Sequence, residues 1–312
     1  MILNAGNILL IGSILLFVSI VVGKAGFRFG VPALLLFLGV GMLFGTDGLG
    51  IEFNNPQTAQ FIGVIALSII LFSGGMDTSA AEIKPVLGQG IVLATVGVMF
   101  TAFLTGYFIY YITNLENSFV TLNFTESLLL ASVMSSTDSA SVFSILRSKR
   151  QGLKENLRPM LELESGSNDP MAYMLTILLI GIIQSGENSL SNTILQFIMQ
   201  MSIGAVSGYL LGRLAVYCIN KLNINQSLYP VLLLAFVFFI FSFTDLVKGN
   251  GYLAVYLAGL VVGNHKVVHK KSLTTFFDGI TWLFQIVMFL TLGLLVNPAE
   301  LLPVAALSIL IG

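Results

Sequence analysis

The chain has 312 residues, of which 56% are hydrophobic and only 9% are charged, against about 25% charged residues in an ordinary soluble domain. Its net charge of −1 provides no basic field for nucleic-acid phosphates, and its single cysteine, Cys218, excludes a disulfide within the chain and a cluster of thiolate metal ligands. These figures exclude a soluble globular enzyme, a disordered protein and a nucleic-acid-binding protein. They predict an integral membrane protein.

Apolar segments long enough to cross a hydrocarbon core of about 30 Å follow one another along the chain. The first, Ile8 to Val22, has no basic residue before it, so we interpret it as a membrane helix and not as a cleavable signal peptide. An eleventh segment begins at Leu301 and is cut off at Gly312. The predicted fold class is an all-α polytopic membrane protein. The ten complete crossings are expected near residues 7–22, 31–45, 58–76, 85–112, 126–147, 158–184, 191–219, 227–244, 251–264 and 275–296.

Basic residues are distributed unevenly between the loops that join these crossings. Thirteen of the fourteen lysines and arginines lie in the odd-numbered loops or at the helix ends beside them, and Lys248 alone lies on the other side. Because cytoplasmic loops carry the excess of positive charge, the odd loops are predicted to be cytoplasmic. The N-terminus is then periplasmic, in a cell inner membrane.

Two segments, 126–147 and 158–184, carry acidic residues at membrane depth. Asp138 lies nine residues before Arg147, about 13 Å at helical rise, and Asp169 lies eleven residues after Arg158, about 16 Å. Half of the hydrocarbon core is about 15 Å, so both aspartates are expected near the midplane on consecutive antiparallel helices. Charges at this depth are costly and usually functional.

Small hydroxyl residues surround the first of these aspartates. Such side chains compete for backbone groups, which favours a break in the helix, and an unwound stretch at the midplane supplies carbonyl oxygens for a cation. The run consists of Ser135, Ser136, Thr137, Ser139 and Ser141.

The second acidic segment has its polar residues at helical spacing. Glu162, Ser165 and Asp169 share one face, and Glu164 and Asn168 share the adjacent face. The next residue, Pro170, lacks an N–H group and is expected to loosen the turn before it. Together the two segments predict an oxygen-rich pocket that contains one or two carboxylates.

Three other interpretations of these residues stay open. The two acids could form only a hydrogen bond between helices, although two unpaired buried acids are expensive to keep. Two aspartates on neighbouring helices also occur in intramembrane aspartyl proteases, but Asp138 and Asp169 lack the Gly-x-Gly-Asp pattern of those enzymes. A cation channel or a pH sensor could be built on the same scaffold.

Four sequence stretches resemble monovalent cation:proton antiporters, in particular the bacterial potassium/proton antiporter branch that is related to sodium/proton exchangers. The motif in the second acidic segment is the specific one, and the resemblance covers essentially the whole chain. The stretches are Ser136 to Leu146, Leu163 to Ala172, Asn250 to Asn264 and Met288 to Leu295.

The resemblance implies a fold of about thirteen helices in two inverted repeats, in which a core domain moves against a dimerisation domain. Residues 1–312 then form one cation/proton exchanger transmembrane domain, with a first repeat over about 1–184 and an incomplete second repeat over about 191–312. A homodimer in the lipid bilayer is implied, with a monovalent cation (K⁺ or Na⁺) and a proton as the transported species. Neither enzymatic activity nor a cofactor is expected.

The same resemblance assigns roles to the polar residues. Asp169 is expected to take either a proton or a cation, and Ser165, Asp138 and the backbone around Thr137 are expected to help coordinate the cation. Asn168 stands where electrogenic relatives carry a second aspartate, which implies electroneutral exchange. An arginine on the eleventh helix would normally hold Glu164 and Asn168, and that part of the helix is absent from these 312 residues.

Two further patterns have ordinary explanations. Glycines spaced four residues apart predict close helix packing, and His265 and His269 are interpreted as solvated loop residues because no carboxylate or cysteine completes a metal site. The glycine pairs are 41 and 45, 208 and 212, and 259 and 263.

Overall fold

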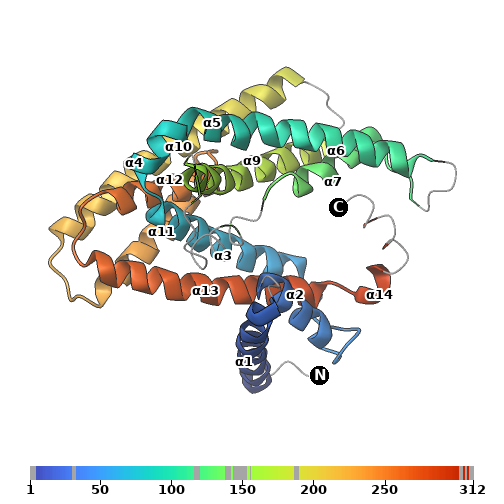
Figure 1. Ribbon diagram of the computed structural model, residues 1–312, viewed down its shortest axis with the longest axis horizontal. Helices are drawn as coiled ribbons and strands as arrows, with labels where there is room; N and C mark the ends of the chain where they lie inside the picture. Colours follow the sequence, from blue (N-terminus) through green and yellow to red (C-terminus); the bar gives the residue numbers. More distant parts are fainter. Residues whose placement is uncertain are drawn as a thin grey trace. The chain divides into compact units, whose positions relative to one another are not determined.

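The computed structural model describes residues 5–29, 33–115, 120–137, 142, 153–154, 156–185, 190–301, 305 and 308. Within these residues all regular secondary structure is helical (Figure 1). A 3₁₀ turn over Lys84–Val86 and a π-helical stretch over Leu93–Gly97 join three of the helices into one continuous run. The helices are α1 (Ala5–Phe29), α2 (Ala33–Phe44), α3 (Pro56–Asp77), α4 (Ala80–Ile83), α5 (Leu87–Val92), α6 (Val98–Thr113), α7 (Phe124–Met134), α9 (Leu157–Ser185), α10 (Leu190–Lys221), α11 (Leu228–Leu246), α12 (Gly251–Asn264), α13 (Lys270–Leu295) and α14 (Pro298–Leu301).

Six of the described helical runs are long and apolar enough to cross a membrane, and four shorter apolar helices accompany them. Each of the ten predicted crossings overlaps one of these ten, so the all-α fold class is confirmed. The number of helices that cross and the inverted repeat stay predictions. The six are Pro56–Asp77, Ala80–Thr113, Leu157–Gln184, Leu195–Lys221, Leu228–Leu246 and Lys270–Leu295, and the four are Leu9–Lys24, Ala33–Phe44, Phe124–Met134 and Gly251–Asn264.

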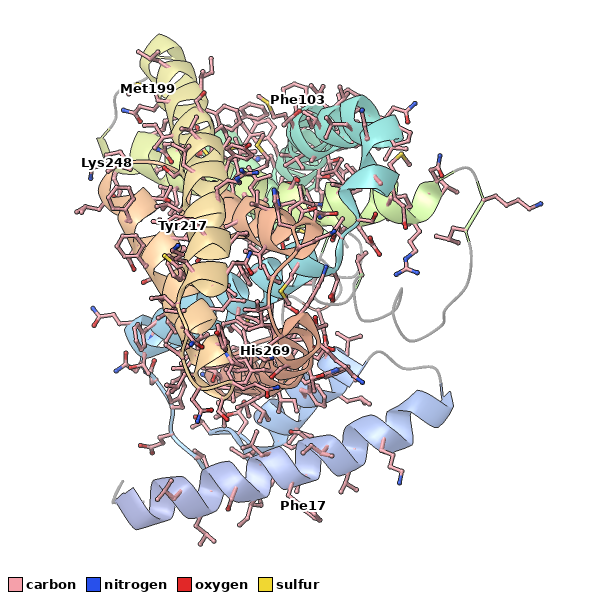
Figure 2. All side chains as sticks on the ribbon, turned by 90° about the vertical axis from the view of Figure 1, so that its left-hand side faces the viewer. Phe17, Phe103, Met199, Tyr217, Lys248 and His269 are labelled. Atoms are coloured by element: carbon pink, nitrogen blue, oxygen red, sulfur yellow. The ribbon has the colours of Figure 1, made fainter. Side chains whose placement is uncertain are left out.

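Large apolar side chains lie on the outer surfaces of several of these helices. Phe17 on α1, Phe103 on α6 and Met199 on α10 are 70, 53 and 50% exposed and are labelled in Figure 2. In water, so many exposed apolar side chains would be an aggregation liability. Hydrocarbon is the solvent that suits them, which agrees with the membrane assignment.

The chain divides into two compact units, and the first contains residues 1–69 and 278–310. In this unit α2 lies directly against α13. A Cβ atom on Gly41 would lie 2.5 Å from the carbonyl oxygen of Leu290 and 2.8 Å from the Cα of Gly293, so only glycine permits this approach. Asp47 Oδ2 accepts a hydrogen bond of 2.9 Å from the backbone N–H of Ala299, which joins the end of α2 to the start of α14.

The second unit, residues 70–277, is organised around the buried helix α12. On one side, a Cβ on Gly208 of α10 would lie 2.5 Å from the Ala254 carbonyl oxygen, and a Cβ on Gly212 would lie 2.9 Å from the Ala258 Cα. On the other side, Gly259 and Gly263 of α12 face the backbone carbonyls at the end of α3. The predicted packing role of these glycines is confirmed.

Candidate ion-binding site

Helix α7 has a well-defined start. The Asn123 side chain accepts a hydrogen bond of 2.9 Å from the backbone N–H of Glu126, and the Glu126 carboxylate accepts one of 2.8 Å from the backbone N–H of Asn123. This reciprocal pair is a capping box, which satisfies two of the N–H groups that a helix start leaves without partners. The sequence therefore fixes where the helix begins.

The helix ends at Met134, in the middle of the predicted crossing 126–147. Ser135 Oγ donates to the Ser132 carbonyl at 2.8 Å, and Ser132 Oγ donates to the Leu129 carbonyl at 2.8 Å. These serine hydroxyls bond to backbone carbonyls of the last turns of the helix, a local side-chain to backbone bonding that competes with continuation of the helix. The helix therefore ends inside the predicted crossing, where the hydroxyl residues favour a break, and residues 138–141 and 143–147 of that crossing lie outside the described residues.

Residues 135–137 follow the helix as a turn and a bend, outside its regular hydrogen-bonding pattern. Ser135 is buried, Ser136 is half-buried and Thr137 is exposed. The first aspartate of the predicted pair, Asp138, lies outside the described residues, as do Ser139 and Ser141.

Helix α9 carries the second aspartate and continues through Pro170 without a break. Asn250, which caps the start of α12, donates from Nδ2 to the Pro170 carbonyl at 3.0 Å. Gly166, one turn earlier, packs against the buried ring of Tyr256. The bond from Asn250 therefore fastens the part of α9 next to Asp169 to the start of α12.

The Ser136 hydroxyl joins the interrupted helix to α9. Its Oγ lies 2.5 Å from Asp169 Oδ1 and 3.0 Å from Asn168 Oδ1, and it can donate to both oxygens. A hydroxyl has one hydrogen, so the two acceptors compete for it. The Ser136 hydroxyl can therefore donate to the Asp169 carboxylate or rotate and donate to Asn168 Oδ1 instead.

The Asn168 amide holds two further groups in place. Its Nδ2 donates to Thr137 Oγ1 at 2.7 Å and to Glu164 Oε1 at 2.8 Å, which uses both amide hydrogens. Thr137 Oγ1 in turn donates to Ser165 Oγ at 3.4 Å. Five of the six predicted site residues therefore meet: Asp169, Asn168, Ser165, Glu164 and Thr137.

Burial differs across this cluster. Ser165 and Asn168 are 0% and 1% exposed, whereas Glu164 and Asp169 are half-buried and Thr137 is exposed. Ser165 and Asn168 are thus the buried members of the cluster, and the two carboxylates and Thr137 are more accessible. Carboxylate, hydroxyl and amide oxygens are ligands that suit a hard cation.

Glu162 lies on the helix face of Ser165 and Asp169, as its spacing predicted, and its Oε1 pairs with Arg158 Nε at 2.9 Å, one turn earlier on the same face. Two other features of the site were not predicted from the sequence. Ser136 was not predicted to contact Asp169; its place in the run of small hydroxyl residues was the only signal. Asn250 was not predicted beside this site either, although an asparagine before an apolar run is typical of a helix cap.

The sequence profile of the family described as "Sodium/hydrogen exchanger, transmembrane" matches residues 12–312. The chain belongs to this family. That agrees with the resemblance found in the four sequence stretches.

Two curated relatives are potassium/proton antiporters by name. The chain is 43% identical over 297 residues to "K(+)/H(+) antiporter NhaP" of Alkalimonas amylolytica, which covers 95% of this chain and 50% of the relative. It is 38% identical over 304 residues to "K(+)/H(+) antiporter NhaP2" of Shewanella sp. (strain ANA-3), which covers 96% of this chain and 51% of the relative. The chain spans about half the length of these relatives.

A solved structure has a similar fold. The sodium proton antiporter MjNhaP1 from Methanocaldococcus jannaschii, determined at pH 8, matches with a TM-score of 0.80 and 21% sequence identity over 96% of this chain and 72% of that one. At this identity the match shows that the two proteins share a fold.

Proposed function

We propose that this chain is the transmembrane part of a secondary antiporter that exchanges K⁺ or Na⁺ for H⁺. The observation that carries the proposal is the position of the Asp169 carboxylate. It lies on a helix apolar enough to span a membrane, within 2.5 Å of the hydroxyl that follows the interrupted helix α7. The names of the curated relatives, K(+)/H(+) antiporters, support the same reaction.

Exchange is proposed to follow from competition at one carboxylate. A charged carboxylate is expensive to keep in a poorly solvated site, and either a proton or a cation removes that cost. A proton and a cation cannot both neutralise the same carboxylate at one time. If the empty, charged site does not cross between the two sides, each passage carries one species or the other, and the fluxes are coupled.

The hydroxyl groups are suited to both states. When Asp169 is charged and without a cation, Ser136 donates its hydrogen to the carboxylate. When a cation is bound, the same hydroxyl can donate to Asn168 and turn an oxygen lone pair toward the ion. Thr137, Ser165 and Asp138 are proposed as further ligands.

We propose that the exchange is electroneutral. Asn168 is an amide whose hydrogens are both committed, to Glu164 and Thr137, so it titrates no proton. One titrating carboxylate then carries one charge in each direction. The arrangement we propose is a homodimer in the inner membrane, with the N-terminus periplasmic and two inverted repeats in each protomer.

The experiment is a proton-gradient assay on the protein reconstituted into vesicles that contain a quenched pH-sensitive dye. Addition of K⁺ or Na⁺ should dissipate the pH gradient without an imposed voltage. A flux that requires a voltage would instead identify a channel. A gradient unchanged by either cation would contradict the proposal.

A further inference from the structure

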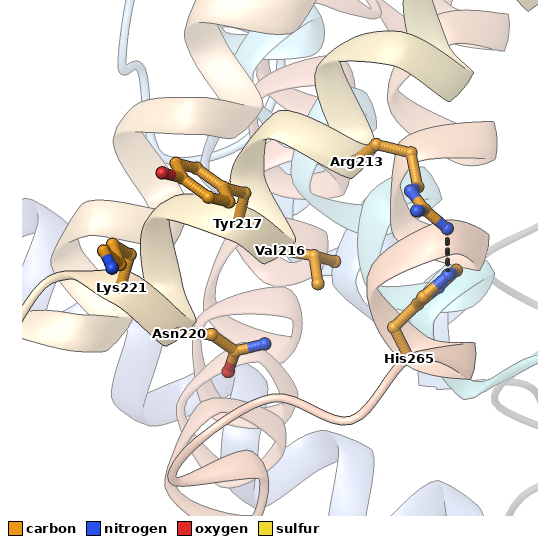
Figure 3. A pocket seen from close by; sticks show the side chains of 6 residues that line it. All are labelled: Arg213, Val216, Tyr217, Asn220, Lys221 and His265. Carbon is orange, nitrogen blue, oxygen red and sulfur yellow. Dashed lines mark hydrogen bonds between the residues drawn. The ribbon is translucent and has the colours of Figure 1, made fainter.

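A second polar site lies in the second unit, where the end of α10 meets the end of α12. It is a pocket with a volume of about 390 Å³, and Figure 3 shows the side chains that line it. Among the described residues no carboxylate contributes to the lining. The lining residues are Arg213, Val216, Tyr217, Asn220, Lys221 and His265.

One cation of this pocket is not at a helix end. Arg213 lies inside α10, eight residues or about 12 Å before Lys221, the last residue of the helix. The candidate membrane span is 27 residues long and also ends at Lys221, whereas about 20 residues cross the hydrocarbon core. Its excess length is expected to bring Arg213 and Lys221 into the layer of the lipid headgroups.

His265 holds Arg213 in place and accepts only one of the hydrogen bonds that its guanidinium group can donate. His265 Nδ1 lies 2.6 Å from the Val261 carbonyl oxygen, and since a carbonyl only accepts, Nδ1 is the protonated nitrogen. Nε2 is then free to accept the hydrogen bond of 2.7 Å from Arg213 Nη1, the dashed line in Figure 3. A guanidinium has five N–H donors, so four stay available to an anion.

This arrangement changes one of the sequence interpretations. His265 is half-buried and bonded on both ring nitrogens, so its interpretation as a solvated loop residue is wrong. His269 is exposed, as expected.

The loop that closes the pocket is also fixed. Asn220 Nδ2 donates to the Lys266 carbonyl at 2.8 Å, and Asn220 Oδ1 accepts from the Val268 N–H at 3.0 Å. The segment after α12 is thereby fastened to the end of α10. The pocket wall is thus built by specific bonds and does not depend on the chance position of a loose loop.

The surface that leads to the pocket along α10 is apolar. At 100° per residue, the apolar residues and the pocket residues of α10 fall on a single face of the helix. The exposed fractions are 59% for Val206, 54% for Tyr209, 58% for Leu210, 44% for Leu214 and 63% for Tyr217. A hydrocarbon-compatible stripe therefore ends at two cations and a tyrosine, the type of residue found at membrane interfaces.

We propose that this pocket binds the headgroup of an anionic phospholipid, whose acyl chains lie along the apolar stripe of α10. Arg213 and Lys221 contact the phosphate oxygens, and Tyr217 lies between them on the same face of α10. The continuity of the stripe with the pocket favours a lipid over a soluble phosphate. The two cations and the absence of a carboxylate from the described lining favour an anionic headgroup over a zwitterionic one.

The test is the thermal stability of the purified protein in detergent as a lipid is titrated in, since a ligand that binds only the folded state raises the Tm. Phosphatidylglycerol should raise the Tm, whereas phosphatidylcholine with the same acyl chains and inorganic phosphate should not. Lys221→Gln and Arg213→Gln should each weaken the phosphatidylglycerol effect about fivefold in concentration. Lys271→Gln, which removes an exposed cation outside the pocket, should leave it unchanged.

Each other result overturns the proposal. An equal shift from inorganic phosphate would make the pocket a site for soluble anions, and an equal shift from phosphatidylcholine would remove the headgroup selectivity. Loss of the effect in Lys271→Gln to the same extent as in Lys221→Gln would assign it to general surface charge. Native mass spectrometry of retained lipids gives a second readout for Arg213→Gln, should that variant lose stability on its own.

Discussion

Helix α12 meets the end of α3 through glycines, whereas α9 meets the end of α7 through hydroxyl and amide groups. At the first contact, Gly259 and Gly263 place the α12 backbone directly on the carbonyls of Phe72 and Met76. At the second, Ser136 reaches two acceptors on α9, at 2.5 and 3.0 Å. Both contacts lie in the same compact unit.

The glycine contact between α3 and α12 is a rigid support, whereas the polar contact between α7 and α9 can exchange its hydrogen bonds. A glycine contact between backbones has one good geometry, because close-packed atoms cannot be displaced without opening a void or a clash. A hydroxyl with two acceptors can change partner by rotation about one bond. We therefore expect changes at the glycine contact to affect stability and changes at the polar contact to affect ion exchange.

The largest expected effect is that of Asp169→Asn, which keeps the volume of the side chain and removes its titrating charge. Cation-driven proton flux should fall by at least about a hundredfold, because the group that both ions neutralise is gone. Flux in reconstituted vesicles is the measurement, and the Tm should stay near that of the wild type. Asp245→Asn, the same change at an exposed carboxylate on α11, is the control. Substantial flux from Asp169→Asn would remove Asp169 from the mechanism.

Gly259→Ala tests the other side of the comparison. The added Cβ would overlap the Phe72 carbonyl, so the free energy of unfolding should fall by about 1–3 kcal/mol. Exchange per folded molecule should be kept. Gly181→Ala is the matched control, since a Cβ there meets nothing within 4 Å and the substitution should be neutral or slightly stabilising. Equal Tm values for the two variants would contradict the rigid role given to the α3–α12 contact.

Ser136→Ala should have the converse effect. It removes the hydroxyl that contacts Asp169 and should weaken cation binding about tenfold, the usual effect of one hydrogen bond to a charged group. The Tm should change little. Ser202→Ala, at an exposed position on α10, serves as the control, and the half-saturating cation concentration for proton flux is the measurement. A large loss of Tm with normal cation affinity would make Ser136 a packing residue.

The smallest expected effect is that of voltage. Since Asn168 provides no second titrating group, an imposed membrane potential should leave the exchange rate unchanged. The measurement compares initial rates in vesicles with and without the potential. A clear dependence would show that more than one proton moves per cation and would point to Asp138 or Glu164 as the additional carrier.

The sequence predicted most of the site because polar residues at membrane depth are few and α9 keeps its helical period. That period put Ser165 and Asp169 on one face and Glu164 and Asn168 on the adjacent face of the same helix. The run of small hydroxyl residues, and not the period, predicted a break near Thr137, and α7 ends at Met134.

Other contacts of the structure join residues of different segments, and the helical period of a single segment does not predict such contacts. Once α7 ends, the backbone leaves the helical repeat, so spacing could not show that Ser136 contacts Asp169. The bonds of Asn250 to Pro170 and of Arg213 to His265 join residues 80 and 52 positions apart, and only the packing of whole helices brings them together.

The central claim is that one carboxylate receives either a proton or a cation, and the pH dependence of the apparent KM for the cation tests it most directly. In the acidic range, where Asp169 is mostly protonated, each fall of one pH unit should raise the apparent KM about tenfold, because a cation must displace a proton from the same group. The maximal rate should stay constant. An apparent KM that does not change with pH while the maximal rate falls would place the proton and the cation at separate sites and contradict the account.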